Sequence, residues 1–151
     1  MRFASREKAL FCQPEVAGGV LPGGGANEWL PKLMGRPRAL EVILGGEDFD
    51  ATTAELYGWV NRSLPDAQLD EFVDRLAKRV ASFDRQATAV AKRLINRASV
   101  PTGEDLLESQ NAFLAATRWP QLGARIQKAR ARAAVVGADF ELQLGHYLGN
   151  L

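Results

Sequence analysis

The most informative stretch of this chain reads Phe11-Cys12-Gln13-Pro14-Glu15 and continues, after a short spacer, as Leu21-Pro22-Gly23-Gly24-Gly25. It places a carboxylate shortly before a glycine-rich turn. Glycine lets a backbone N–H approach a ligand closely, and a helix that follows such a turn favours negative charge at its N-terminus. The stretch therefore predicts a site that combines an acidic side chain with backbone N–H groups.

Short elements are expected around this stretch. Phe3-Ala4 and Ala9-Leu10-Phe11 predict two brief strands on either side of a charged turn. Apolar residues at helical spacing predict a helix over 26–34, in which Pro31 is compatible only with the first turn. These elements frame the glycine-rich turn.

A second helix is expected to begin at Pro37 and to end at Gly45-Gly46. A short helix over 51–57 and a strand over 59–62 follow it. The buried stripe of the second helix is expected to consist of Ala39, Leu40, Ile43 and Leu44.

The chain from Asp66 onward predicts amphipathic helices. Apolar residues recur there at steps of three and four, with charged residues on the opposite face. Asp84 is placed to cap a second helix of this region, and Thr102 with Asp105 forms the capping-box-like start of a third. A fourth helix is expected over 121–134.

The composition sets broad limits on function. The 19 Lys and Arg residues nearly balance the 18 Asp and Glu residues, and the formal net charge is +1. This charge gives no reason to expect a nucleic acid or an anionic membrane as partner. No apolar run approaches the roughly 20 residues of a membrane span, and residues 1–6 do not begin a signal peptide. We therefore expect a cytoplasmic protein.

The chain has too few cysteine and histidine residues for an internal disulfide or a Cys/His metal site. The one cysteine, Cys12, has no partner for an internal disulfide, and no Cys/His spacing suggests a metal site. A chain of 151 residues is long enough for a single domain with a core of its own.

The ordered motifs resemble those of the enoyl-CoA hydratase/isomerase (crotonase) family. There, Phe-Gly-Gln-Pro-Glu precedes Ile-Pro-Gly-Gly-Gly and a helix. Residues 33–41, 43–51 and 54–62 are similar, in order and spacing, to the family segments Leu-Val-Gly-Arg-x-x-Ala-Leu-Glu, Leu-Leu-Thr-Gly-x-x-Phe-Asp-Ala and Ala-x-x-x-Gly-Leu-Val-Asn-Arg. Residues 92–96 stand where the family has a helix of the form Ala-x-Lys-x-Leu-x-Asn. The likeness covers residues 1 to about 118.

The resemblance implies an α/β fold that is predominantly helical. Residues 1–64 would form a partial crotonase-like spiral of short strands and helices with the glycine-rich active-site turn, and residues 65–151 a C-terminal helical region of the same domain. The family's C-terminal helices make trimer contacts, so a homo-oligomer, a trimer or hexamer, is implied. Both oxyanion donors, most of the CoA pocket and a second glutamate lie in upstream family segments, which implies a truncated chain without an oxyanion hole.

The resemblance also implies roles for particular residues. Hydration of an enoyl thioester needs an acid, a base and donors that hold the enolate-like oxygen. The match implies Glu15 as a catalytic acid or base and Gly23 as the residue whose N–H helps to hold the catalytic water. Gly24, Gly25 and Trp29 are implied on the substrate-binding side. The substrate would be an acyl-CoA thioester, with no separate cofactor.

The chain also departs from the family pattern at several positions. Cys12 replaces a common glycine, and residues 26–29 read Ala-Asn-Glu-Trp where Gly-Thr-Gln-Arg is more usual. Glu28 is therefore expected to add a carboxylate near the pocket, and Trp29 to add bulk there.

Blander interpretations stand beside these roles. A glutamate in a Gly-rich region is more often a solvated loop residue, because Glu is rarely buried unless paired. Cys12 is expected to behave as a small buried hydrophobe rather than a reactive thiol. The basic residues Arg125, Lys128 and Arg132 could meet CoA phosphates or form a solvated helix face.

A second hypothesis makes the chain a non-catalytic oligomerisation or interaction module derived from the crotonase fold. Its amphipathic helices from Asp66 onward would pack on copies of themselves or on a full-length relative. Exposed apolar surface, which tends to mark partner sites, is then expected at Phe3, Phe11, Val16 and Val20.

Overall fold

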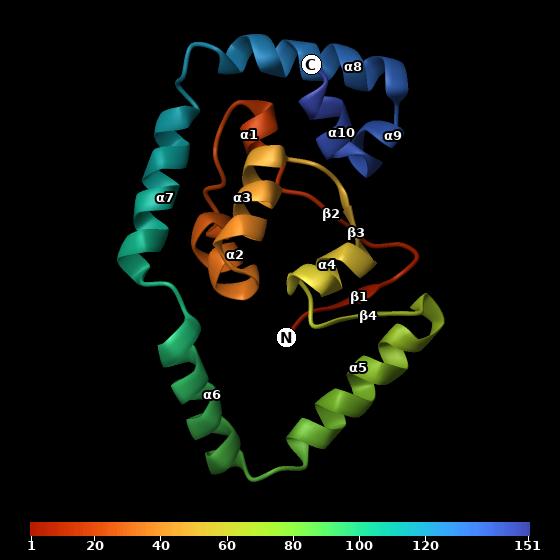
Figure 1. Cartoon of the computed structure of the whole chain (residues 1–151), viewed down its shortest axis with the longest axis vertical. Coiled ribbons are helices and arrows are strands. Elements are labelled where there is room, and N and C mark those ends of the chain that lie inside the picture. Colours follow the sequence, from red (N-terminus) through yellow and green to blue (C-terminus); the bar gives the residue numbers. More distant parts are fainter.

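A computed structural model describes residues 1–151. Figure 1 shows short strands and helices at the centre of the molecule, with longer helices along its periphery. The elements in chain order are β1 (Phe3–Ser5), β2 (Leu10–Phe11), α1 (Glu15–Gly18), α2 (Ala26–Met34), α3 (Arg36–Gly45), β3 (Phe49–Asp50), α4 (Ala51–Tyr57), β4 (Arg62–Leu64), α5 (Asp66–Ala81), α6 (Arg85–Ser99), α7 (Gly103–Ala116), α8 (Leu122–Val136), α9 (Asp139–Leu142) and α10 (Leu144–Gly149).

The strands form two separate pairs. β1 runs parallel to β4, with Phe3 opposite Arg62, and β2 runs antiparallel to β3, with Phe11 opposite Phe49. The strand expected over 59–62 is placed wrongly, because the ladder begins only at Arg62. Each pair is a two-stranded sheet, so every strand has one edge without a hydrogen-bonded neighbour.

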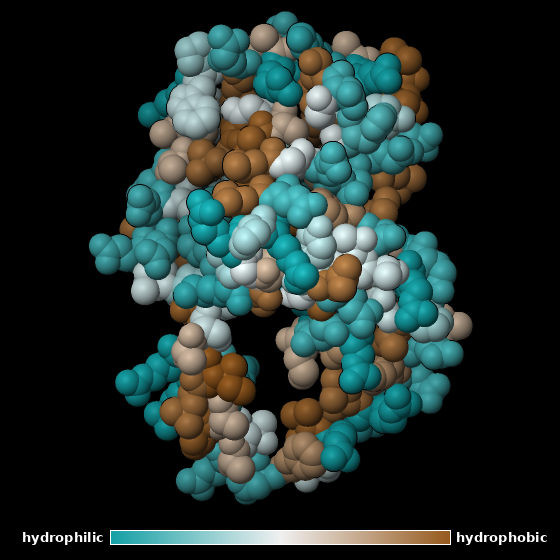
Figure 2. All heavy atoms as spheres, viewed as in Figure 1, coloured by the Kyte–Doolittle hydropathy of each residue, from teal (hydrophilic) through white to brown (hydrophobic).

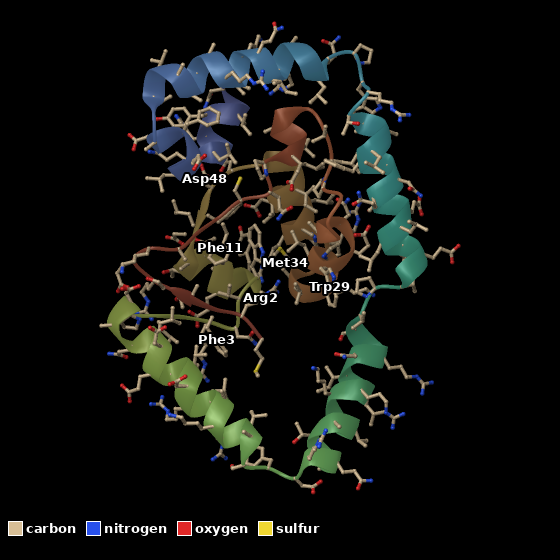
Figure 3. The ribbon with its side chains drawn as sticks, turned by 180° about the vertical axis from the view of Figure 1, so that it is seen from behind. Arg2, Phe3, Phe11, Trp29, Met34 and Asp48 are labelled. Carbon is tan, nitrogen blue, oxygen red and sulfur yellow. The ribbon has the colours of Figure 1, made fainter.

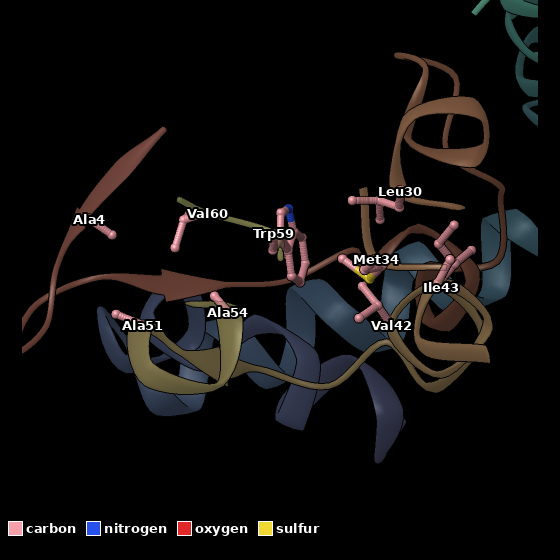
Figure 4. Packing of buried hydrophobic residues seen from close by; sticks show 10 residues of the cluster. Ala4, Leu30, Met34, Val42, Ile43, Ala51, Ala54, Trp59 and Val60 are labelled. Carbon is pink, nitrogen blue, oxygen red and sulfur yellow. The ribbon is translucent and has the colours of Figure 1, made fainter. Parts of the chain in front are cut away.

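The core joins the strand pairs to the helices α2, α3 and α4. Figure 4 shows Trp59 between a group from β1, α4 and the segment before β4 and a group from α2 and α3. The stripe expected on α3 is half wrong. Ala39 and Ile43 are buried, but Leu40 and Leu44 are 37% and 62% exposed, and Val42 is fully buried instead. The helix contacts α1 and α2, and Val42 belongs to the same buried cluster as Leu30 and Met34 of α2.

The capping residues in the sequence predict the starts of two helices correctly. The Asp84 side chain accepts a hydrogen bond from the Ala87 N–H, and the Thr102 hydroxyl accepts one from the Asp105 N–H, so both predicted caps are confirmed. The expectation for Pro31 is wrong, because it lies past the first turn of α2. The helix loses one backbone hydrogen bond there and still continues, since Leu30 and Met34 on either side of Pro31 are buried.

Two of the long helices are almost uncovered. Neither α5 nor α6 contains a buried residue, although Phe72 of α5 packs against Phe3, with ring centroids 5.1 Å apart. Figure 2 shows a hollow between these helices, with hydrophobic side chains on both of its inner sides. Phe3, Phe11, Val16 and Val20, where exposed apolar surface was expected, are half-buried.

Helix length and polarity bear on membrane association. None of the ten helices combines the length and the apolarity that crossing a bilayer requires.

The C-terminal tail, for which no helix was predicted, folds into the short helices α9 and α10.

Candidate functional site

Glu15 is the first residue of α1. The Val20 N–H donates to the Glu15 carbonyl oxygen at 2.9 Å, and Gly19 ends the helix with a positive φ of 96°. The side chain is half-buried, and its Oε2 atom is buried without any hydrogen-bond partner. Burying a carboxylate oxygen without a hydrogen-bond partner costs free energy of folding, so we expect this atom to bind a group from outside the chain.

The three glycines of the turn are not equivalent. A Cβ on Gly23 would lie 2.6 Å from the Phe113 side chain of α7, whereas one on Gly24 would meet nothing within 4 Å. Gly25 has a φ of 95°, and a Cβ there would lie 2.9 Å from Leu106. Gly23 and Gly24 donate their N–H groups to no backbone carbonyl of the chain. The turn therefore offers free donors and is held close to α7.

Helix α7 covers the turn with one face. Leu106, Ser109 and Phe113 are spaced by three and four residues, so they share a side of the helix. Leu106 faces Gly25, and Phe113 faces Gly23. A single stripe of α7 thus runs along the turn and the start of α2.

Glu28 points toward this stripe and does not line the pocket beside the turn. The Ser109 hydroxyl donates to its Oε1 atom, while its Oε2 atom is buried and unpaired. The Asn27 amide donates to the Pro22 carbonyl at 2.8 Å and to the Ser109 hydroxyl at 3.2 Å. Glu28 thus adds a carboxylate to the contact between α2 and α7, while its neighbours Ala26 and Trp29 line the pocket. Sequence reasoning missed Asn27 and Ser109, and no local signal links positions so far apart.

A pocket of about 630 Å³ lies beside the turn. Gly24, Gly25 and Trp29, the three residues expected on the substrate-binding side, all line it. Ile95 and Ser99 of α6 contribute to the same wall, whereas Glu15 and Gly23 do not line this pocket. Figure 3 shows Trp29 on α2 in the central part of the molecule, far from Asp48 near α9 and α10.

Cys12 belongs to a different, structural cluster. Its thiol donates to the Gly46 carbonyl at 3.4 Å, and burial together with the nearby Asp48 carboxylate raises its pKa to about 12. Asp48 accepts the N–H groups of Gly145 at 3.0 Å and His146 at 2.9 Å. The thiol is therefore protonated at neutral pH. No three His, Cys, Asp or Glu side chains gather as a metal site would need.

The half-buried side chain of Arg125 is bonded to backbone carbonyls of two other helices. Its Nε atom donates to the Ala17 carbonyl at 2.8 Å, and its Nη2 atom donates to the same oxygen and to the Leu148 carbonyl at 3.2 Å. The interpretation of Arg125 as part of a solvated helix face is therefore wrong, and its contact with CoA phosphates stays a prediction. The side chain ties α8 to α10 and to α1, the helix that carries Glu15.

Comparison with known families and sequences gives consistent results. The family model described as enoyl-CoA hydratase/isomerase matches residues 2–120. A short-chain-enoyl-CoA hydratase of Clostridioides difficile is 38% identical over 109 residues, 70% of each chain. A mitochondrial enoyl-CoA hydratase of Pongo abelii is 35% identical over 92 residues, 61% of this chain and 32% of its own. The chain spans 32% to 42% of the first curated relatives that it matches.

Solved structures extend the comparison to the whole chain. A crystal structure of a candidate enoyl-CoA hydratase from Streptomyces avermitilis is 44% identical with a TM-score of 0.95, and the match covers 100% of this chain but 54% of that one. An enoyl-CoA hydratase structure from Mycobacterium avium subsp. paratuberculosis is 25% identical with a TM-score of 0.78, over 86% and 53% of the two chains.

Proposed function

Because the chain belongs to the enoyl-CoA hydratase/isomerase (crotonase) family and has part of its α/β fold, we propose that it contributes one side of an acyl-CoA-handling active site of hydratase/isomerase type. The observation that carries this proposal is the unpaired, buried Oε2 atom of Glu15. A carboxylate oxygen that is kept from water without an internal partner is suited to exchange a proton with a bound reactant.

In this proposal, Glu15 acts as the acid or base that moves a proton between water and the acyl chain. The free N–H of Gly23 holds the water, and α7 fixes the position of that N–H through Phe113. Gly24, Gly25 and Trp29 border the acyl thioester. The pocket lining supports the assignments of Gly24, Gly25 and Trp29. The match to the family motif supports those of Glu15 and Gly23.

The proposal gives residues 1–151 no oxyanion hole. Family resemblance places both oxyanion donors and the second glutamate in other segments, and losing one such donor costs about 10² to 10³ in rate. We therefore expect little or no hydration by these residues alone. The CoA thioester is substrate rather than cofactor, and fatty acid metabolism in the cytoplasm, by a trimer or hexamer, is the expected setting.

A chimera tests the role of Glu15 separately from the missing donors. Residues 1–151 would replace the matching portion of the Streptomyces avermitilis protein, and crotonyl-CoA hydration would be followed by loss of the enoyl-thioester absorbance. We expect Glu15→Gln to slow hydration by about 10² to 10⁴. The exposed Glu47→Gln serves as the matched control and should leave the rate unchanged. Equal rates for the chimera and its Glu15→Gln variant would exclude the proposed role.

A second candidate function is a non-catalytic oligomerisation or interaction module. The uncovered apolar faces of α5 and α6 favour it. Light scattering together with a thermal shift in crotonyl-CoA separates the two on the 151-residue chain. Binding of crotonyl-CoA supports the first function, whereas a concentration-dependent oligomer without ligand binding supports the second.

A further inference from the structure

The peptide that joins Pro22 to Gly23 is bonded at one end and free at the other. The Asn27 side-chain amide donates to the Pro22 carbonyl oxygen at 2.8 Å, whereas the Gly23 N–H donates to no backbone carbonyl. The chain has no cis peptide bond, and in a trans peptide the C=O and N–H bonds point in opposite directions. The bond from Asn27 therefore also determines where the free N–H points.

The backbone on either side does not hold this peptide in one orientation. Glycine takes positive and negative φ with similar ease, so the peptide before Gly23 can turn over at little steric cost. Pro22 is fully buried, but its ring restricts φ and not the ψ about which the peptide turns. The hydrogen bond to the Pro22 carbonyl therefore selects between the two orientations.

Asn27 is itself held in one orientation by two further side chains. The second hydrogen of its amide goes to the Ser109 hydroxyl at 3.2 Å. The hydroxyl oxygen can accept this bond because its own proton is donated to the Glu28 carboxylate. Turning the amide over would bring its oxygen against the Pro22 carbonyl oxygen and the Ser109 oxygen. The network therefore has a single direction, from Asn27 to Ser109 and on to Glu28.

Burial strengthens these bonds. Ser109 is 8% exposed, and Asn27 and Glu28 are half-buried. Hydrogen bonds in such surroundings are electrostatically stronger than in water, and bonds in a chain polarise one another. A bond to the carbonyl oxygen of a peptide thus makes the N–H of the same peptide a better donor. Ser109 is the one hydrogen-bond donor to the Glu28 carboxylate, so this carboxylate serves the network alone.

We propose that Asn27 is a positioning residue, which acts through the Pro22 carbonyl to hold the Gly23 N–H in the direction that binds the reacting water. Ser109 and Glu28 hold Asn27 in turn. Asn27 and Glu28 stand where the family pattern usually has Thr and Gln, so the network uses residues in which this chain departs from that pattern. The role of the water rests on the proposed function, whereas the orientation of the peptide does not.

Kinetics of the chimera described above test this role. Asn27→Ala should lower kcat for crotonyl-CoA hydration about tenfold to hundredfold, because a misplaced donor no longer holds the water in a reactive position. KM should stay nearly unchanged, since Asn27 does not line the pocket beside the turn. Asn111→Ala removes the same amide from an exposed position of α7 and is the matched control.

A second pair of variants leaves Asn27 in place. Ser109→Ala removes the bond that orients the Asn27 amide and should also lower kcat. Ser109→Thr keeps the hydroxyl and should lose less of the rate than Ser109→Ala. A contact that only joins α2 to α7 would instead lower the free energy of unfolding and leave kcat of the folded chimera unchanged.

Nuclear magnetic resonance on the 151-residue chain tests the orientation of the peptide without any catalysis. The carbonyl carbon of Pro22 is deshielded by the bond from Asn27, so its signal should move upfield in Asn27→Ala. Asn111→Ala should leave this signal in place.

Two results would overturn the proposal. One is an unchanged kcat in Asn27→Ala while Glu15→Gln slows the same chimera, because the proposed function would then hold without this positioning. The other is an unchanged Pro22 carbonyl signal in Asn27→Ala, because the peptide would then not depend on that bond. Failure of the proposed function would show instead as a chimera that Glu15→Gln does not slow.

Discussion

The Cys12 thiol lies where burial and a neighbouring carboxylate both oppose its ionisation. Burial raises its pKa to about 12, and the negative charge of Asp48 contributes because it repels a thiolate. At pH 8 we expect iodoacetamide to modify Cys12 far more slowly than free cysteine, as followed by mass spectrometry. Asp48→Asn should accelerate the reaction, and the neighbouring Glu47→Gln is its control. Modification of the unaltered chain at the rate of free cysteine would contradict this account.

Gly145 lies against the backbone of the segment that follows α3. A Cβ at this position would overlap the Gly46 carbonyl oxygen, while a Cβ on Gly149 in the same helix would meet nothing within 4 Å. We expect Gly145→Ala to lower the free energy of unfolding by about 1–3 kcal/mol, the usual range for forced overpacking. Urea unfolding of both alanine variants checks this. Equal stability of the two would show that the backbone shifts freely there.

Glu55 also affects stability through a single side chain, in a pH-dependent way. Its Oε2 atom accepts the Ser63 hydroxyl at 2.6 Å and the Ser63 N–H at 2.8 Å, and these bonds lower its pKa below the ordinary 4.5. A lowered acidic pKa stabilises the fold above the unfolded-state value, and this stabilisation is lost as the pH falls through the folded-state value. Urea midpoints should therefore decrease below about pH 4.5, and less steeply for Glu55→Gln. Identical pH profiles would rule out this contribution.

At the scale of secondary structure, Arg125 determines how firmly α1 is held. Its guanidinium bonds to the Ala17 and Leu148 carbonyls, and hydrogen bonds to charged groups contribute about 1.5–3 kcal/mol. We expect Arg125→Met to increase hydrogen exchange at the Gly18 and Val20 amides. Lys128→Met, at an exposed position of the same helix, is the control. Unchanged exchange in Arg125→Met would show that α1 is held by other contacts.

The helices and strands also show which features could be predicted from the sequence: those set by neighbouring residues could, and those set by distant residues could not. Helix starts at Asp84 and Thr102 depend on residues three positions apart, so they could be predicted from the sequence. The buried side of α3 depends on which neighbours pack against it. The spacing predicts Leu40 there, whereas the structure buries Val42. Strand β4 forms only because β1, far away in the chain, lies beside it. Spacing within the chain does not contain that information.

At the scale of the whole molecule, the candidate site also has a part that could be predicted from the sequence and a part that could not. Glu15 and the glycines of the turn are close in sequence and match a motif, so they could be identified before the structure. Phe113, Ser109 and Arg125 reach the turn, α2 and α1 from helices far along the chain, and no pattern in the sequence pairs them with those partners. The motif therefore predicted the candidate residues but not the contacts that hold them.

The contact between α7 and the glycine-rich turn has a kinetic consequence. Phe113 is packed against Gly23 so closely that no side chain fits between them, and Leu106 faces Gly25 in the same way. The turn can rearrange only when this part of α7 lifts away. In the proposed role of Gly23, any release of the held water that requires the turn to change shape can then be no faster than this local opening of α7.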